Sequence, residues 1–196
     1  MGDVCMERVD IMVDIETLGK SSDSTIIQIS AIAFDILTGN HISTFNEIAD
    51  IEKNENLLEV DASTLKWWLK TDKELLTKLL NSGKHSSETI LAHFNGWLRV
   101  QSNDIKNVYL WGNGILFDNK MIQHQMELNG YKYPIFYKND RDVRTIVDLA
   151  SAKLGLSEKE LKDRFKDDSL VEHNALDDVK YQINLVVGCY KTLING

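Results

Sequence analysis

Residues 9–19 read VDIMVDIETLG, and this stretch decides the fold and organises the site. It is a short apolar run, rich in β-branched residues and followed by turn residues, and it therefore predicts a buried strand. Residues i and i+2 of a strand point to the same face, so Asp14 and Glu16 project together. Adjacent carboxylates repel, and burying them is costly unless positive charge lies between them. Either the two acids lie solvated on an edge strand, or they bind a divalent cation such as Mg²⁺ or Mn²⁺, which prefers oxygen ligands.

Length and composition indicate one globular domain. The chain has 196 residues, of which 43% are hydrophobic, and its single proline is Pro134. We expect one domain over residues 1–196, with residues 1–8 as a loose lead-in. No apolar stretch reaches the ~20 residues that cross a bilayer, and the N-terminus lacks a signal-peptide core, so no membrane partner is expected. Cys5 and Cys189 are too few for a disulfide framework, which favours a cytoplasmic protein.

The net charge of −8 disfavours a broad basic surface for nucleic acid. The charge count omits bound cations, which bring positive charge of their own. An enzyme that holds phosphates through metal ions is therefore not excluded.

Hydrophobic periodicity predicts an antiparallel meander followed by helices, in an α/β arrangement. The second and third strands are expected at 25–35 and 41–48, and the turn at 37–40 joins them. A fourth strand is expected at 107–111. We expect helices over residues 63–81 (opened by Ser63 or Thr64), 87–98, 117–128 and 141–154, a short one capped by Ser157, and a last one over 175–193.

Two further segments carry acids at the ends of expected elements. Asp118 follows the turn Gly112-Asn113-Gly114 at a strand end, where sites in α/β sheets gather. The favourable helix dipole in a first turn is an equally simple explanation of Asp118.

The second segment, residues 173–178, reads HNALDD and opens the last helix. Asn174 is expected to cap this helix, with Asp177 at its third position. Capping explains Asp177 but gives no role to Asp178, and it leaves His173 outside the helix.

Taken together, these residues resemble the signature of the DEDDh family of 3′–5′ exonucleases. That family carries D-x-E near the N-terminus, an Asp after a G-N or H-N turn, and H-x4-D near the C-terminus. All three occur here in order, over about residues 10–192. The resemblance implies an RNase H-like fold, in which a mixed sheet with an antiparallel three-strand meander is flanked by helices.

The resemblance also implies two-metal hydrolysis of the 3′-terminal phosphodiester of a single-stranded nucleic acid, giving nucleoside 5′-monophosphates. By this resemblance, Asp14, Glu16 and Asp178 hold one Mg²⁺ or Mn²⁺ ion. Asp14 bridges to a second ion, which Asp118 binds. His173 is expected to take the proton of the attacking water. Relatives of this kind imply a homodimer.

Substrate contacts follow from the same resemblance: Thr17, Leu18 and Asn113 are expected to bind the terminal nucleotide. Segments 63–68 and 141–145 are similar to the phage exonuclease A branch, to exodeoxyribonuclease VIII-like proteins and to bacterial exoribonuclease relatives. We expect DNA as the substrate. An exoribonuclease acting on RNA ends or short oligoribonucleotides is the alternative, because the catalytic set is the same. A binding module without catalysis is a lesser alternative, since the intact acids argue against it.

Three residues have two open roles each. Trp67 and Trp68 are adjacent on the expected helix and point about 100° apart. At most one of them is then fully buried, and the other is free to stack on a base. Arg144 either contacts phosphate or pairs with Asp142 or Asp148.

Overall fold

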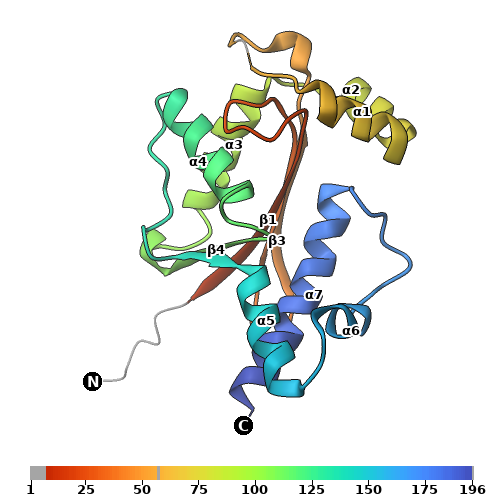
Figure 1. The fold of residues 1–196 in the computed structure, drawn as a ribbon. Helices are drawn as coiled ribbons and strands as arrows, with labels where there is room; N and C mark the ends of the chain where they lie inside the picture. The colour runs from red at the N-terminus through yellow and green to blue at the C-terminus, as the bar shows by residue number, and fades with distance from the viewer. Residues whose placement is uncertain (1–7, 57, 196) are drawn as a thin grey trace.

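The computed structural model describes residues 8–56 and 58–195. A mixed five-stranded sheet runs through its centre in the order β3-β2-β1-β4-β5 (Figure 1). The strands are β1 (Val9–Thr17), β2 (Ile26–Phe34), β3 (His41–Ile48), β4 (Val108–Gly112) and β5 (Asp140–Asp142). The first three pair antiparallel, whereas β4 lies parallel to β1 and β5 parallel to β4. The predicted meander and mixed sheet are therefore confirmed.

β1 lies in the middle of the sheet, and its two faces bury different clusters. Ile11, Val13 and Ile15 pack with α3 (Ser87–Arg99) and α4 (Asp118–Leu128). Met12 packs on the other face with α5 (Val143–Leu154) and α7 (Ala175–Ile194). The strand period of two therefore puts the acids at positions 14 and 16 on the Met12 face, toward α7.

Helices cover both faces of the sheet (Figure 1). α3 and α4 lie on one side, and α5, α6 (Glu158–Asp163) and α7 lie on the other. α1 (Ala62–Thr71) and α2 (Lys73–Ser82) form an arm at one end, which encloses a smaller apolar cluster with Leu18 and Ile27. Two short 3₁₀ turns, Ile51–Lys53 and Ile105–Asn107, join these elements.

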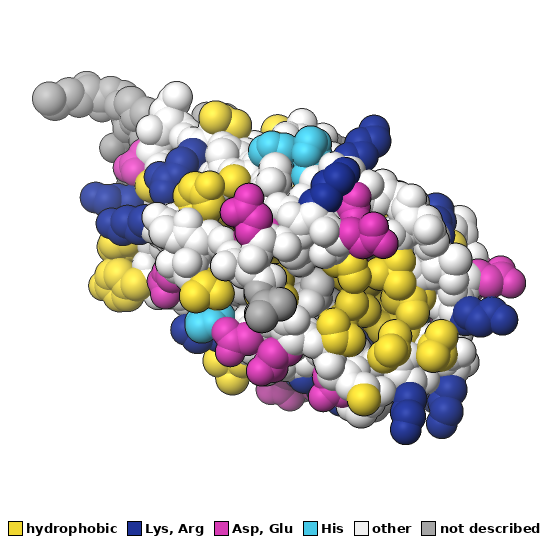
Figure 2. Space-filling view, turned by 90° about the horizontal axis from the view of Figure 1, so that it is seen from above, with side chains coloured by type: hydrophobic (Ala, Val, Ile, Leu, Met, Phe, Trp, Pro, Cys, Tyr) yellow, Lys and Arg dark blue, Asp and Glu magenta, His cyan; other side chains and the backbone are white. Residues whose placement is uncertain are grey.

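The arm leaves apolar side chains at the surface. Figure 2 shows hydrophobic groups gathered on one side of the face that is seen from above. Large exposed apolar residues in and beside α1 are Val60, Trp67 and Leu69. Within residues 8–56 and 58–195, no helix combines the length and apolarity that crossing a membrane requires.

The single helix expected over residues 63–81 is wrong, because the structure has two helices there. Asp72 ends α1, where its N–H donates to Trp68 O, and its side chain accepts from Leu75 N to begin α2. One aspartate thus serves as the C-cap of one helix and the N-cap of the next. The start of α1 is also corrected, since Asp61 rather than Ser63 or Thr64 is its N-cap.

The helix expected from residue 141 begins later than predicted. Residues 140–142 form β5, which pairs with β4 through Leu110 and Asp140, and α5 starts at Val143. Asp142 caps α5 by accepting from Thr145 N. Three polar residues carry no alternating apolar pattern, so nothing in the sequence marked this strand.

The caps of the last two helices are as predicted. Ser157 forms a capping box with Glu160 at the start of α6, and Asn174 accepts from Asp177 N at the start of α7. Residues 1–7 of the expected lead-in lie outside the described residues. Its last residue, Arg8, forms an ion pair with the buried Asp10.

Candidate active site

Three carboxylates from two elements meet at the C-terminal end of β1. Asp14 and Glu16 project from the strand, and Asp178 projects from the first turn of α7. One oxygen of each lies within 4.8 Å of the others. The strand period therefore brings positions 14 and 16 together as the sequence predicts, and the long-range approach of α7 adds the third acid.

The segment before α7 is held by the same carboxylate. His173 has a positive φ of 63°, a left-handed conformation that is uncommon for residues other than glycine. Its backbone N–H donates to Asp178 Oδ2 at 3.1 Å. Its ring meets the ring of Trp67 edge to face, with the centroids 5.0 Å apart. Helix α1 and the start of α7 therefore meet at His173, beside the acids.

Asp118 approaches from the end of β4. It is the first residue of α4 and is 4% exposed. The group of three carboxylates within 4.8 Å does not include it. Its charge nevertheless reaches Asp14, whose pKa it helps to raise. The structure thus brings all four predicted acids into one region, with Asp118 as its outer member.

Burial dominates the electrostatics of these acids. Desolvation, followed by the charges of Asp118 and Asp178, raises the pKa of Asp14 well above its ordinary value. Desolvation and the neighbouring acids raise the pKa of Glu16 to about 10. Desolvation raises the pKa of Asp118 to about 7, against the opposing effects of the amides of Asp118 and Ile15 and of the charge on Arg144. Desolvation also raises the pKa of Asp178 to about 6, although the His173 side chain and its amide oppose the shift.

The three inner acids have no lysine or arginine partner within the part of the chain that the structure describes. Among the described residues, no ion pair includes Asp14, Glu16 or Asp178. Clustered carboxylates in this state either hold protons or bind a cation. An all-oxygen donor set fits hard divalent ions such as Mg²⁺ and Mn²⁺.

Gln182 is a site residue that the sequence analysis missed. Its side-chain amide donates to Asp14 Oδ1 at 3.0 Å, and it is 4% exposed. It lies four residues after Asp178, so both project from the same face of α7. That spacing was the available signal, but a glutamine in an apolar helix has no distinctive pattern.

A cavity of about 470 Å³ opens on the α1 side of the acids. Glu16, Thr17, Trp67 and Trp68 line it, together with Ile15, Gly19, Lys20, Ser63, Thr64 and Phe117. Trp68 is 1% exposed and its indole donates to Thr17 O, whereas Trp67 is 43% exposed. One tryptophan is therefore core, and the other is available to a ligand.

The predicted nucleotide contacts occupy different positions. Thr17 lines the cavity. Leu18 is 3% exposed and packs among Ile27, Trp68 and the leucines of α2. Asn113 is exposed in the turn after β4.

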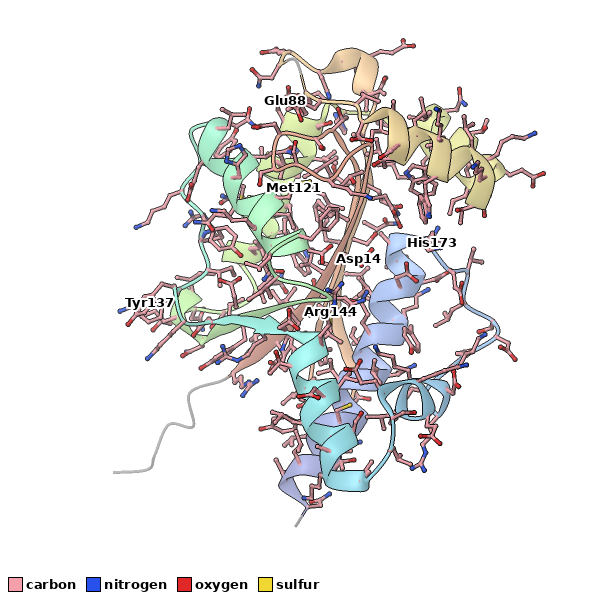
Figure 3. All side chains as sticks on the ribbon, viewed as in Figure 1. Asp14, Glu88, Met121, Tyr137, Arg144 and His173 are labelled. Atoms are coloured by element: carbon pink, nitrogen blue, oxygen red, sulfur yellow. The ribbon has the colours of Figure 1, made fainter. Side chains whose placement is uncertain are left out.

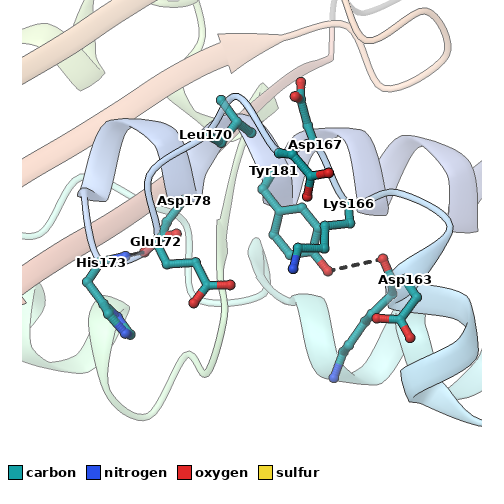
Figure 4. Close-up of a pocket in the computed structure, with 10 residues that line it drawn as sticks. Asp163, Lys166, Asp167, Leu170, Glu172, His173, Asp178 and Tyr181 are labelled. Carbon is teal, nitrogen blue, oxygen red and sulfur yellow. Dashed lines mark hydrogen bonds between the residues drawn. The ribbon is translucent and has the colours of Figure 1, made fainter. Parts of the chain in front are cut away.

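A second hollow, of about 500 Å³, adjoins the site on the other side of His173. It lies between α7 and the loop that follows α6, and Figure 4 shows His173, Asp178 and Tyr181 along its wall. Lysines and acids both line it, so its charge is mixed.

Comparison with known families assigns the chain to one of them. A family model described as 3′–5′ exoribonuclease Rv2179c-like domain matches residues 9–190, which include every acid described above. The chain belongs to this family. Membership makes it a 3′–5′ exonuclease domain, and it confirms the predicted enzyme class and the resemblance to DEDDh exonucleases.

Individual relatives agree with this assignment. The exodeoxyribonuclease of Enterobacteria phage T4 is 25% identical over 162 residues, which cover 71% of this chain and 70% of that protein. Cell-death related nuclease 4 (CRN-4) superposes with a TM-score of 0.69 at 13% identity, over 93% of this chain and 64% of that one. The nuclease domain of 3′hExo, a DEDDh family member solved with rAMP, gives 0.64 at 15% identity, over 97% and 94%. The two solved structures confirm the predicted RNase H-like fold, and this chain spans less than two thirds of CRN-4.

Proposed function

We propose that this exonuclease domain holds two divalent cations, Mg²⁺ or Mn²⁺, through Asp14, Glu16, Asp118 and Asp178. The observation that carries the proposal is the approach of three carboxylates, from β1 and α7, to within 4.8 Å of one another. Burial raises the pKa values of these three acids, and the neighbouring acids raise those of Asp14 and Glu16 further. Divalent ions would compensate the clustered negative charge.

Bound cations of this kind polarise the scissile phosphate and acidify the attacking water. The chain's own residues orient the site and move the proton. A ring nitrogen of His173 accepts the proton of the attacking water, as a positioned imidazole does in general base catalysis. The bond from the His173 amide to Asp178 ties this base to an acid of the site. Gln182 fixes the orientation of the Asp14 carboxylate.

The cavity of about 470 Å³ is suited to the terminal nucleoside. It adjoins Glu16, offers the half-exposed indole of Trp67, and includes Thr17 at its wall. Aromatic side chains commonly stack on bases. Asn113 and Leu18 remain predicted contacts. Leu18 is buried and packs in one cluster with Trp68, which lines the cavity, so we expect Leu18 to support that wall.

Both sugars fit the proposal, and each has its own support. The description of the family specifies exoribonucleases, which favours single-stranded RNA. The T4 relative is an exodeoxyribonuclease, which favours single-stranded DNA. A direct comparison of matched RNA and DNA oligonucleotides assigns the sugar.

The polarity of attack tests the function. With Mg²⁺ or Mn²⁺, single strands labelled at the 5′ end should shorten one nucleotide at a time and release 5′-monophosphates. A 3′-phosphate should block the reaction, because the cavity must seat a free terminal nucleoside, whereas a blocked 5′ end should have little effect. Cleavage of a circular single strand at a comparable rate would indicate an endonuclease instead. Binding without any hydrolysis would support the inactive binding module.

We extend the proposal to one domain over residues 1–196, which rests on length, and to a place in the cytoplasm, which rests on the two cysteines. The homodimer is proposed by analogy with relatives of this kind. Sedimentation velocity tests the dimer directly. A monomer at all concentrations would remove that part and leave the chemistry unaffected.

A further inference from the structure

Arg144 is an exposed cation beside an acidic site, and helix stability does not explain it. It is the second residue of α5 and therefore lies in the first turn. The helix dipole disfavours a positive charge at this end. Asp148 lies four residues later, but with the basic residue first such a pair is the weaker orientation. Among the described residues no ion pair includes Arg144.

Asp142, the other carboxylate offered by the sequence, is already occupied by backbone groups. Its Oδ1 accepts from Thr145 N at 3.1 Å and its Oδ2 from Ile115 N at 3.2 Å. These bonds cap α5 and fix the loop after β4. Since Arg144 forms no ion pair within residues 8–56 and 58–195, the hydrogen-bonding fork of its guanidinium is available to an anion.

The guanidinium lies against the turn that leads into Asp118. Gly114 has a φ of +125°, and a Cβ at that position would be 3.2 Å from Arg144 Nη2. The Gly114 carbonyl accepts from the amides of Phe117 and Asp118 at the start of α4. Of the four acids, only Asp118 has Arg144 among the causes that set its pKa. Arg144 thus lies at the Asp118 end of the site.

The opposite end carries the cavity for the terminal nucleoside, beside Glu16 and Trp67. In the view of Figure 3, Arg144 lies on the far side of Asp14 from the α1–α2 arm. If the last nucleoside occupies the cavity and the scissile phosphate lies over the acids, a strand that leaves the site at its Asp118 end would run away from the cavity. On that path its next phosphate would come to Arg144, which lies against Gly114.

Building on the proposed function, we propose that Arg144 binds the phosphate of the second linkage from the 3′ end, one nucleotide upstream of the bond that is hydrolysed. A guanidinium recognises phosphate through two parallel hydrogen bonds. The contact would hold the strand so that the leaving 3′-oxygen remains in place, which makes Arg144 a substrate-binding residue specific to chains longer than a dinucleotide.

A charge-removal cycle tests the contact. Release of the first 3′-terminal nucleotide is measured on two short single strands of the same sequence. In one, all linkages are phosphodiesters; in the other, the second linkage from the 3′ end is a neutral methylphosphonate. Arg144→Gln should lower kcat/KM by about 10-fold or more on the first strand, as the loss of a charge-assisted hydrogen bond does. Wild-type protein should lose a similar factor on the neutral strand, and the variant should lose nothing further there, because both changes remove one interaction.

Controls separate this contact from general effects. Arg144→Lys should recover part of the activity, since it keeps the charge without the fork. Lys159→Gln removes an exposed charge on α6 and should match wild type. A methylphosphonate at the third linkage should lower kcat/KM by the same factor in wild-type and Arg144→Gln protein, because the two changes are then independent.

Independent losses from Arg144→Gln and the neutral second linkage would overturn the proposal, as would full activity of Arg144→Gln. Wild-type protein that releases no nucleotide would instead refute the proposed function. In that case the same cycle, measured as oligonucleotide affinity by fluorescence anisotropy, still decides whether Arg144 contacts this phosphate.

Discussion

The two ends of β1 carry buried acids on one face of the strand, but their surroundings differ. At the N-terminal end, both oxygens of Asp10 lie 2.7 Å from nitrogens of Arg8, and the Trp111 indole adds a bond of 2.7 Å. At the C-terminal end, Asp14 accepts one hydrogen bond, from the neutral side-chain amide of Gln182. Glu16 has no side-chain partner among the described residues.

This contrast shows that the fold can neutralise a buried carboxylate on this face with an arginine. The absence of one from the described surroundings of Asp14 and Glu16 is therefore not forced by the architecture. An uncompensated cluster costs folding free energy unless a proton or a cation compensates it. Removing the partner of Asp10 should therefore lower the free energy of unfolding, whereas removing the charge of Asp14 should not lower it.

The largest expected effect is on catalysis at the C-terminal end. Asp14→Ala should abolish hydrolysis with Mg²⁺ and with Mn²⁺, because the family resemblance makes this carboxylate the bridge between the two proposed cations. Removing it relieves repulsion, so the unfolding free energy in EDTA should stay equal or rise. Nuclease assays and urea unfolding measure the two quantities.

Asp148→Ala is the matched control for this variant. It removes an exposed acid of α5 whose side chain accepts no hydrogen bond among the described residues, and it should leave activity and stability unchanged. Substantial turnover by Asp14→Ala protein with a native circular dichroism spectrum would contradict the metal assignment.

The next effect separates the histidine from the acids. His173→Ala should lower turnover by ~10²–10⁴, the usual loss of a positioned base. Its backbone amide still donates to Asp178, so Mn²⁺ affinity measured by calorimetry should change little. His173→Asn provides a second test, since asparagine tolerates the left-handed backbone but is not a base. Loss of metal binding in both variants would make His173 part of the metal site instead.

Local rules placed the central residues of the candidate site on their own strand or helix. The period of two along β1 placed positions 14 and 16 on one face, and the cap at Asn174 left His173 outside α7 and Asp178 within it. The family resemblance joined these segments to Asp118. Each step required only a short pattern and its order along the chain.

What the sequence did not predict depends on contacts between distant segments. Gln182 acts on Asp14 across 168 positions of the chain. The ion pair between Arg8 and Asp10 at the other end of β1 was not predicted, because Arg8 was expected to belong to a loose lead-in. β5 exists because residues 140–142 add to the edge of β4, and its polar residues carry no strand pattern of their own.

A smaller effect on stability tests the N-terminal end of β1. Arg8→Gln should lower the unfolding free energy by roughly 1–3 kcal/mol, because it leaves the buried Asp10 with fewer partners. Arg8→Lys should recover part of this loss, although the stacking of the guanidinium on Tyr109 at 4.5 Å is also lost. Asp14→Asn, measured by the same urea titration in EDTA, should not be destabilised. If both ends lost stability alike, the contrast between them would be wrong.

The smallest effect is the slope of stability against pH, and the Glu16→Gln variant isolates the part that Glu16 contributes. The folded pKa of Glu16 is raised to about 10 from the ordinary 4.5, so folding favours its protonated form. Its contribution to stability is complete below the ordinary pKa and is lost as pH rises toward the folded value. Asp178 and Asp118, with pKa values of about 6 and about 7, act in the same direction in the lower part of this window. In EDTA the melting temperature should therefore fall from about pH 5 to about pH 9.

Glu16→Gln resembles the protonated acid and should flatten this slope, whereas Glu74→Gln, at an exposed position of α2, should leave it unchanged. Mn²⁺ should counteract the fall, because metal binding displaces the protons and grows stronger as pH rises. At 100 times its dissociation constant, a ligand that binds only the folded protein adds about 2.7 kcal/mol. A melting temperature in EDTA that rises over the same range, or an equal slope in Glu16→Gln protein, would show that Glu16 is already ionised in the folded chain. The C-terminal end of β1 would then hold its charge without a cation, and the difference from the Asp10 end would disappear.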